Sequence, residues 1–319
     1  MRSDDDVIAF ERPVDYSSTG SNPPRFMGAQ FVHPHVPGPA HPSNPPQVQQ
    51  QAQLPGLVER WLVPGEGVCF GSVTLFFPPS IVDTTTPRKP MPAVVWYQKE
   101  EISASAPPAG VSNLTSQGYV VAFPELCGFG SVGPAFSPEL SGTGQAAEDM
   151  AHEIGRSVPG FHAGGVYRFS HFLNGRTDVS AIKLIVAQDY IDVAVLHAIL
   201  AEPGIAPPQL ALLRPAASLA AAALNRFYAT GNYYSWIVGI VKAYDLADCI
   251  AAITNGSPGV EVLVVGPVDE TLTPLADGAA SAAYAFASRV SPAGALRVEP
   301  GTFSDAMAAD MVLRFLKKP

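Results

Sequence analysis

Asp189 lies at a position in the chain where a carboxylate could act as a nucleophile. Asp189 lies two residues after a short, largely apolar run, residues 182–187, and directly precedes a second apolar run, residues 190–201. The first run predicts a buried strand and the second a helix, so Asp189 is expected at a strand-to-helix turn. A carboxylate there could cleave an ester only if a histidine activated the water that clears the covalent intermediate. The last histidine of the chain is His197, which is expected on the helix itself.

The elements around Asp189 predict an α/β fold. Short apolar runs predict strands, and they alternate with helix-compatible segments. We expect strands over residues 68–77, 93–97, 119–123, 182–187, 260–265 and 295–298, and helices over residues 109–117, 190–201 and 306–317. This alternation is typical of a doubly wound, mostly parallel sheet.

The beginning of the chain differs in composition from the rest. Residues 1–56 are rich in proline and include a glutamine-rich run, residues 47–53. Proline fixes φ and lacks an amide hydrogen, which excludes a regular helix or a central strand. We therefore expect an extended arm over residues 1–56 and a globular domain over residues 57–319. Such an arm becomes ordered only when something holds it, which favours a subunit of a larger assembly.

Composition excludes several classes of protein. A net charge of −9 argues against nucleic acid as a partner, and the most apolar runs are interrupted by charges, which argues against a transmembrane segment. The acidic start of the chain is unlike a signal peptide, although a removed presequence stays an open alternative. The three cysteines are widely spaced, so free thiols in a reducing intracellular compartment are expected: Cys69, Cys127 and Cys249.

No cofactor and no metal are expected. The glycine pairs near residues 128–130 and 142–144 lack the lysine and the preceding strand of a phosphate-binding loop. Three histidines lie in the proline-rich arm, where their spacing fixes no common ligand face: His33, His35 and His41. We interpret them as solvated or packed side chains.

Several longer segments are similar to those of a known family. They are PAVVWYQ (92–98), LTSQGYVVAFPELCGFGSVG (114–133), GRTDVSAIKLIVAQDYIDVAVLHAILAEP (175–203), YYSWIVGIVKAYDLADCIAAI (233–253), VEVLVVGPVDETLTP (260–274) and FSDAMAADMVLRFLKK (303–318). Together they resemble the acetyl-xylan-esterase and dienelactone-hydrolase branch of the α/β-hydrolases. The resemblance implies an α/β-hydrolase fold with a helical cap at approximately residues 204–240.

The resemblance also implies where a catalytic triad would lie. It places the nucleophile at Asp189, the acid at Asp269, and the histidine in the loop that contains Gly301 and Thr302. The expected serine and histidine are both absent. Ile191 stands where the turn needs a small residue, so a sharp turn is not expected there. Without a histidine to orient, Asp269 is expected to serve its own turn.

The oxyanion loop and the base also depart from the family pattern. Residues 98–101, Gln-Lys-Glu-Glu, replace the glycine-rich sequence whose amides stabilise developing negative charge. Asp189 is therefore expected to cap the following helix rather than to attack a substrate, and His197 is interpreted as a core or interface histidine. Three histidines that precede Asp189 could replace the missing base: His152, His162 and His171.

These departures predict a catalytically inactive, α/β-hydrolase-like protein that acts as a structural or interaction subunit. Its expected contact surfaces are the arm, residues 1–56, and an aromatic group in the cap: Tyr228, Tyr233, Tyr234 and Trp236. The alternative is a hydrolase of a carbohydrate ester or another small ester, with a non-standard site around Asp189. A third hypothesis, a ligand-binding protein without turnover, requires an apolar cavity beneath the cap.

Overall fold

The structure, a computed structural model, describes residues 25–32, 56–64, 70–81, 88–100, 102, 107–130, 151, 153, 155–229, 235–257 and 259–316. Some residues named in the predictions above lie outside these ranges. They are His33, His35, His41, Cys69, Glu101, His152, Tyr233 and Tyr234.

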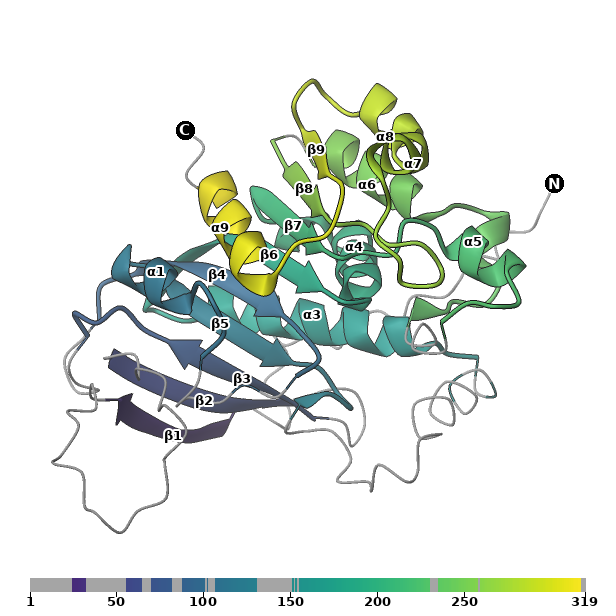
Figure 1. The fold of residues 1–319 in the computed structure, drawn as a ribbon. Helices are drawn as coiled ribbons and strands as arrows, with labels where there is room; N and C mark the ends of the chain where they lie inside the picture. The colour runs from purple at the N-terminus through teal and green to yellow at the C-terminus, as the bar shows by residue number, and fades with distance from the viewer. Residues whose placement is uncertain are drawn as a thin grey trace, which may run out of the picture.

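A nine-stranded sheet forms the centre of the described structure, in the order β1-β2-β3-β5-β4-β6-β7-β8-β9 (Figure 1). Its strands are β1 (Arg25–Val32), β2 (Gly56–Pro64), β3 (Phe70–Phe76), β4 (Met91–Tyr97), β5 (Val120–Glu125), β6 (Val179–Gln188), β7 (Gln209–Leu213), β8 (Glu261–Val265) and β9 (Leu296–Glu299). The strands from β5 to β9 in this order are parallel, whereas β1, β2 and β3 pair antiparallel at one edge. The predicted doubly wound, mostly parallel sheet is confirmed.

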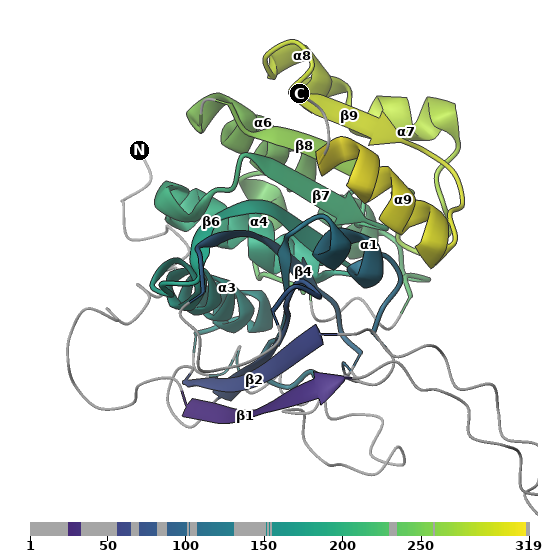
Figure 2. The same cartoon turned by 90° about the vertical axis from the view of Figure 1, so that its left-hand side faces the viewer.

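Helices cover both faces of the sheet (Figure 2). On one face lie α1 (Val111–Ser116) and α9 (Asp305–Leu316); on the other lie α3 (Val158–Asn174), α4 (Ile191–Ala201), α6 (Leu246–Gly256) and α8 (Ala285–Val290). The shorter helices are α5 (Leu219–Leu224), α7 (Asp277–Ala283), η3 (Pro203–Ile205) and η5 (Ile240–Lys242). None of the described helices has the length and apolar character that a membrane span requires.

Side-chain alternation explains why the central strands are apolar throughout. In β4, Val95 and Tyr97 point into the layer of α3 and α4, whereas Val94 and Trp96 point into the layer of α1 and α9. Since both layers are apolar, a strand between them carries apolar residues at every position. This pattern made β4, β6 and β8 predictable from the sequence.

The predicted cap, residues 204–240, is wrong at its beginning. Residues Gln209–Leu213 form β7, which lies between β6 and β8 in the sheet. In the sequence, this apolar run leads within a few residues into an alanine-rich stretch, so no boundary is visible. The part of the segment outside the sheet follows Leu213 and contains α5, which lies far from β1 to β3 (Figure 1).

The predicted arm contributes one strand to the sheet. Residues Arg25–Val32 form β1, which pairs antiparallel with β2 from Arg25 opposite Leu62 to Val32 opposite Gly56. The strand lies at the edge of the sheet, where proline-flanked strands are tolerated. The rest of the arm before Gly56 lies outside the described residues.

A buried network of charges joins β2 to the turn before β6. Glu59 accepts from Arg88 at 2.6 Å and from Arg176 at 3.0 Å, and Asp178 accepts from the same two residues at 2.9 and 2.7 Å. The indole of Trp61 also donates to Glu59, at 2.9 Å. Because an unpaired buried charge is costly, each of these groups depends on its partners.

Glu59→Gln should destabilise the fold strongly, because it removes one of the two buried carboxylates that Arg88 and Arg176 share. We expect the free energy of unfolding to fall by about 3 kcal/mol in urea titrations. The matched control is Asp310→Asn, which breaks the exposed pair of Asp310 with Arg314 on α9 and should cost no more than about 0.5 kcal/mol. Equal effects of the two substitutions would contradict the assignment.

The predicted free thiol is wrong for Cys127, which is disulfide-bonded. Cys249 is a free cysteine, buried on α6, and burial raises the pKa of its thiol to about 12. Since disulfides persist in oxidising environments, the predicted reducing compartment loses its support.

Alkylation before and after reduction tests this assignment. In denaturant without reductant, Cys249 should be modified and Cys127 should not, because only the first is a free thiol. In the native protein Cys249 should also resist modification, since its thiol is buried and protonated. Peptide mass spectrometry gives the readout, and a sample reduced first serves as the control. Modification of Cys127 without reduction would contradict the disulfide.

Candidate functional site

The chain makes a strained turn between β6 and α4. Asp189 and Tyr190 have φ of 50° and 68°, in the left-handed region that residues other than glycine rarely adopt. Such a residue costs on the order of 1–3 kcal/mol and persists only when its surroundings hold it. Ile191 does not prevent the turn, because its side chain is buried in the core. The prediction that a sharp turn is absent is therefore wrong.

Three neighbouring strands end in the same way at this edge of the sheet. β6, β7 and β8 are followed by Asp189, Arg214 and Gly266, with φ of 50°, 52° and 58°. The amide of each donates to the carbonyl that ends the next strand, at Leu213, Val265 and Glu299. A Cβ at Gly266 would lie only 3.0 Å from the carbonyl oxygen of Gly301, so a side chain there would have to displace the loop that contains Gly301.

Arg214 binds the carboxylate of Asp189, which lies in the turn between β6 and α4, hereafter the elbow. Its Nε and Nη2 donate to the two oxygens of Asp189 at 3.0 and 3.2 Å, and its Nη1 donates to Asp305 at 2.8 Å. Gln188 donates a further hydrogen bond to Asp189, at 2.9 Å. The hydrogen bonds with Asp189 raise the pKa of the Arg214 guanidinium, so that it stays charged. A bidentate pair of this kind is both strong and directional.

The predicted capping role of Asp189 is wrong. The residue at the N-cap of α4 is Tyr190, and no side chain caps this helix. The Asp189 carboxylate instead points toward Arg214, which lies at the end of the neighbouring strand. An arginine at that distance competes with any helix amide for the carboxylate.

A cavity of about 420 Å³ opens beside Asp189. Its charged lining consists of one guanidinium and three carboxylates: Arg214, Asp189, Glu100 and Asp305. Trp96 and Gln98, from the end of β4, add an indole and an amide. These groups can bind hydroxyl or amino groups of a ligand, but none of them is a base positioned against a free nucleophile.

Asp269 occupies the position that the resemblance gives to the triad acid. Its carboxylate accepts hydrogen bonds from the turn that it begins. Its Oδ1 accepts from the amide and hydroxyl of Thr271 at 2.8 and 2.7 Å, and from the amide of Thr273 at 2.9 Å. Desolvation raises the pKa of Asp269, but these hydrogen bonds outweigh it and lower the pKa. The expectation that Asp269 serves its turn agrees with this geometry.

The loop where the resemblance places the catalytic histidine contributes only backbone groups to this part of the structure. Gly301 has φ of 100° and its amide donates to the carbonyl of Leu275 at 3.2 Å. Its carbonyl oxygen lies against Gly266, at the end of β8. Thr302 follows in the chain, so the segment before α9 carries no imidazole.

His162, one of the three histidines that could replace the base, is bound elsewhere. Its Nε2 donates to the carbonyl oxygen of Cys127 at 2.9 Å, and its ring packs against Phe129 with centroids 4.6 Å apart. Burial lowers the pKa of His162 to about 4, so the ring is neutral at pH 7. The hydrogen bonds of Asp189 go to Gln188 and Arg214, and none goes to a described histidine.

The other described histidines do not form a site. His171 is exposed and packs on Tyr167, with ring centroids 4.2 Å apart. His197 is buried in α4 and bonds to the Val193 carbonyl at 2.6 Å and to the Tyr244 hydroxyl at 3.0 Å, which confirms the predicted core histidine. Within the described ranges, no group of three His, Cys, Asp or Glu side chains is arranged to hold a metal.

The loop after β4 carries a lysine where the resemblance requires exposed amides. The Nζ of Lys99 lies 4.7 Å from the ring centroid of Tyr190, the residue that follows Asp189. Burial lowers the pKa of Lys99, while Asp189 and Glu100 partly offset the effect. This stacking places an ammonium group beside the elbow, in place of a glycine-rich loop.

Asp192, in the first turn of α4, is a fully buried carboxylate with no hydrogen-bond partner for either oxygen. Burial raises its pKa to about 7, although nearby amides of the helix and the Lys99 ammonium favour the charged form. The buried hydroxyl of Tyr190 also lacks a partner. The first turn of α4 therefore holds polar groups whose hydrogen bonds are not satisfied by described residues.

Arg214 and Asp305 were not predicted to belong to this site. In the sequence, Arg214 is only an interruption of an apolar segment, and Asp305 is the polar residue before the closing helix. One signal was available: Arg214 directly follows a short apolar run, residues 210–213, much as Asp189 follows residues 182–187 with only Gln188 between them. Two charged residues of opposite sign at the ends of parallel strands can meet at the shared edge.

The strand order, the helical layers and the strained turn after β6 define an α/β-hydrolase fold. Solved structures confirm it: acetyl xylan esterase 1 from Thermoanaerobacterium sp. JW/SL YS485 is 12% identical, with a TM-score of 0.53 over 90% of this chain and 86% of that one. An acetyl xylan esterase from Paenibacillus sp. R4 is 13% identical, with a TM-score of 0.52 over 91% and 88%. No family model and no curated protein matches the sequence.

A peptidase shares the same fold. Dipeptidyl peptidase 4 from Porphyromonas gingivalis is 13% identical, with a TM-score of 0.54 over 82% of this chain, which corresponds to 35% of the peptidase. The fold that the resemblance to acetyl xylan esterases implied is thus confirmed.

Asp192→Asn should stabilise the protein, and the gain should depend on pH. A carboxyl group whose pKa is raised on folding binds more protons in the folded state, so stability falls as the pH rises through the window from about 4 to 7. Asparagine has no such titration, and the variant should therefore gain up to about 4 kcal/mol above pH 7 and little below pH 4. Urea unfolding at several pH values measures the difference.

The control for this prediction is Asp277→Asn, at an exposed position in the first turn of α7. It should show no comparable dependence on pH, because its carboxylate is solvated in both states. If Asp192→Asn were less stable than the wild type at pH 8, an unseen partner of the carboxylate would have to exist, and the assignment would be wrong.

Proposed function

We propose that this chain is a non-hydrolytic protein of the α/β-hydrolase fold, which acts by binding partners or ligands. The observation that carries the proposal is the bidentate pair between Arg214 and Asp189. The pair occupies both oxygens of the residue at the nucleophile position. A carboxylate held in this way is a poor nucleophile, because attack would have to break two charge-assisted hydrogen bonds.

The surroundings of the pair support the same proposal. The acid position is used by a turn at Asp269, and the loop with Gly301 and Thr302 supplies no base. A covalent ester on Asp189 would need a base to activate water, and His162 is bound to a backbone carbonyl instead. Each part of a triad mechanism is thus engaged in a structural contact.

A second candidate is hydrolysis of a carbohydrate ester or another small ester at a non-standard site around Asp189. Two observations favour it: the strained elbow geometry is retained, with φ of 50° at Asp189, and a cavity opens beside it. The structural neighbours described as acetyl xylan esterases also favour this candidate over the first. Arg214 would then have to release Asp189 when a substrate enters.

The partner surfaces of the first candidate remain the arm, residues 1–56, and the aromatic group of the cap. Within that group, the rings of Tyr228 and Trp236 pack together with centroids 5.0 Å apart. Mild extraction followed by size-exclusion chromatography and mass spectrometry would show whether the protein elutes within a larger complex. Co-elution with defined partners supports an interaction subunit.

Hydrolysis assays separate the two candidates. With p-nitrophenyl acetate and acetylated xylan, we expect the wild type to be no faster than Asp189→Asn, because the carboxylate is not available as a nucleophile. Asp277→Asn, at an exposed position on α7, serves as the matched control. Arg214→Met is informative as well, since it frees Asp189 and should still give no turnover without a base.

The opposite result identifies an enzyme. If the wild type turns over and Asp189→Asn lowers kcat/KM on the order of a thousandfold while Asp277→Asn does not, then Asp189 is a nucleophile. The second candidate would then replace the first.

A further inference from the structure

Two polar side chains at the start of α4 are buried without a hydrogen bond. Neither carboxylate oxygen of Asp192 has a partner, and the hydroxyl of Tyr190 has none either. Asp192 is 0% exposed, so solvent does not replace the missing partner. Because buried polar groups in folded proteins are nearly always hydrogen-bonded, an exception of this kind calls for an explanation.

Ionisable groups surround Asp192 from several parts of the fold. Those that interact electrostatically with it are Lys99 in the loop after β4, Asp189 and Tyr190 in the elbow, Cys249 on α6, and Tyr284 between α7 and α8. Burial raises the pKa of the thiol and of both phenols, so these three groups are neutral at pH 7. Among these described groups, Lys99 alone supplies a positive charge.

The ammonium of Lys99 faces the same turn of the chain, but it does not contact the carboxyl group. Its Nζ lies 4.7 Å from the ring centroid of Tyr190, two residues before Asp192. The attraction between a cation and an aromatic ring is modest compared with that between two buried opposite charges. Since the lysine side chain is a flexible four-carbon chain, its ammonium can exchange one contact for the other.

The charge of Asp192 decides which contact is favoured. Burial raises the pKa of Asp192 to about 7, so the group is protonated in acid and ionised in weakly alkaline solution. A neutral carboxyl group attracts the ammonium weakly, and the ring of Tyr190 then competes for it. An ionised carboxylate that is buried without a partner is costly, and pairing with a cation removes most of that cost.

We propose that Lys99 and Asp192 form a pH-dependent switch beside the elbow. While Asp192 is protonated, the Lys99 ammonium lies over the ring of Tyr190. When Asp192 loses its proton to water, the ammonium turns to the carboxylate and forms an ion pair with it. Because the pair favours the charged form, the change should be complete slightly above pH 7. The switch requires no turnover, so it is compatible with either function considered above.

The switch would change the charge around the cavity beside Asp189. Lys99 lies in the sequence between Gln98 and Glu100, which both line that cavity, and its charge acts on Asp189 and Glu100. In acid, Lys99 is positive and Asp192 is neutral. In weak alkali, the two charges offset each other, so the surroundings of the cavity lose one positive charge. A cationic ligand is then favoured as the pH rises, and an anionic ligand as it falls.

Crystal structures of the wild type at pH 5 and pH 8 test the movement directly. At pH 5 we expect Lys99 over the ring of Tyr190, and at pH 8 its Nζ within about 4 Å of an Asp192 oxygen. In Asp192→Asn the ammonium should stay over the ring at both pH values. If Lys99 occupies the same place in both wild-type structures, the proposal is wrong.

A double-mutant cycle tests the pair in solution. Urea unfolding of the wild type, Lys99→Met, Asp192→Asn and the double variant gives four equilibrium constants at each pH. At pH 8, Lys99→Met should raise the unfolding constant about tenfold more in the wild type than in the Asp192→Asn background. At pH 5 the two increases should be equal, because the carboxyl group is then neutral.

Lys89→Met is the matched control. Lys89 is an exposed lysine just before β4, whereas Lys99 follows the other end of that strand. Its substitution should show no coupling to Asp192→Asn at either pH. Coupling of Lys99 that is equal at pH 5 and pH 8, or absent at pH 8, would overturn the proposal. Neither experiment measures ester hydrolysis, so a failure here leaves the test of Asp189 as a nucleophile unaffected.

Discussion

The geometry of the elbow depends on one backbone constraint, which three adjacent strands share. β6, β7 and β8 each end in a residue of left-handed φ whose amide still bonds to the next strand. Because the three ends are equivalent, the side chains of Asp189 and Arg214 leave the sheet at neighbouring points and can pair. The attraction between them in turn holds two residues in a strained conformation. The turn between β6 and α4 therefore positions one member of an ion pair.

The sequence allowed the fold to be predicted because its strands are buried on both faces and so read as continuous apolar runs. The site could be predicted only in part. The position of Asp189 followed from a strand-to-helix boundary, but its partner Arg214 lies at the end of β7, a strand that looks like the start of an alanine-rich helix. The expectation about Ile191 failed for another reason. The inward packing of that side chain allows the turn, and a single sequence does not reveal the direction in which a side chain packs.

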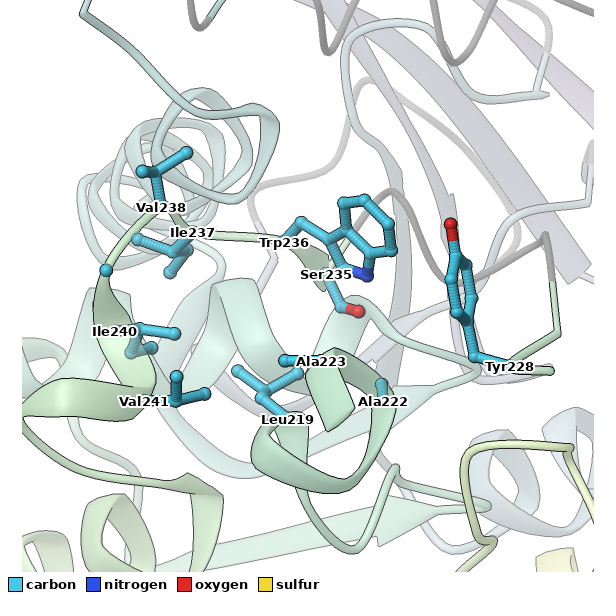
Figure 3. Close-up of a pocket in the computed structure, with 11 residues that line it drawn as sticks. Leu219, Ala222, Ala223, Tyr228, Ser235, Trp236, Ile237, Val238, Ile240 and Val241 are labelled. Carbon is cyan, nitrogen blue, oxygen red and sulfur yellow. The ribbon is translucent and has the colours of Figure 1, made fainter. Parts of the chain in front are cut away.

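A cavity of about 320 Å³, lined by α5, Tyr228 and residues 235–241 (Figure 3), differs from the cavity beside Asp189 in the interactions that a ligand would have to make. The one beside Asp189 is polar and its charges are already paired, so a ligand there would have to compete with existing ion pairs. The one along α5 has no charged side chain among its described lining residues, so a ligand there would mainly have to displace water from apolar walls. Affinity for a small molecule is therefore easier to build at the second cavity, although the resemblance directs attention to the first.

The buried network of Glu59, Asp178, Arg88 and Arg176 has a consequence for the order of folding. Arg176 and Glu59 are 117 residues apart in the sequence, and Arg88 and Asp178 are 90 apart. Contacts of such high sequence separation form only after the intervening chain has closed a long loop, which costs entropy. We therefore expect the network to be unformed in the transition state for folding and to fix β2 to the turn before β6 only late in folding. Its main kinetic effect is on the rate at which the folded protein opens, and not on the rate at which it forms.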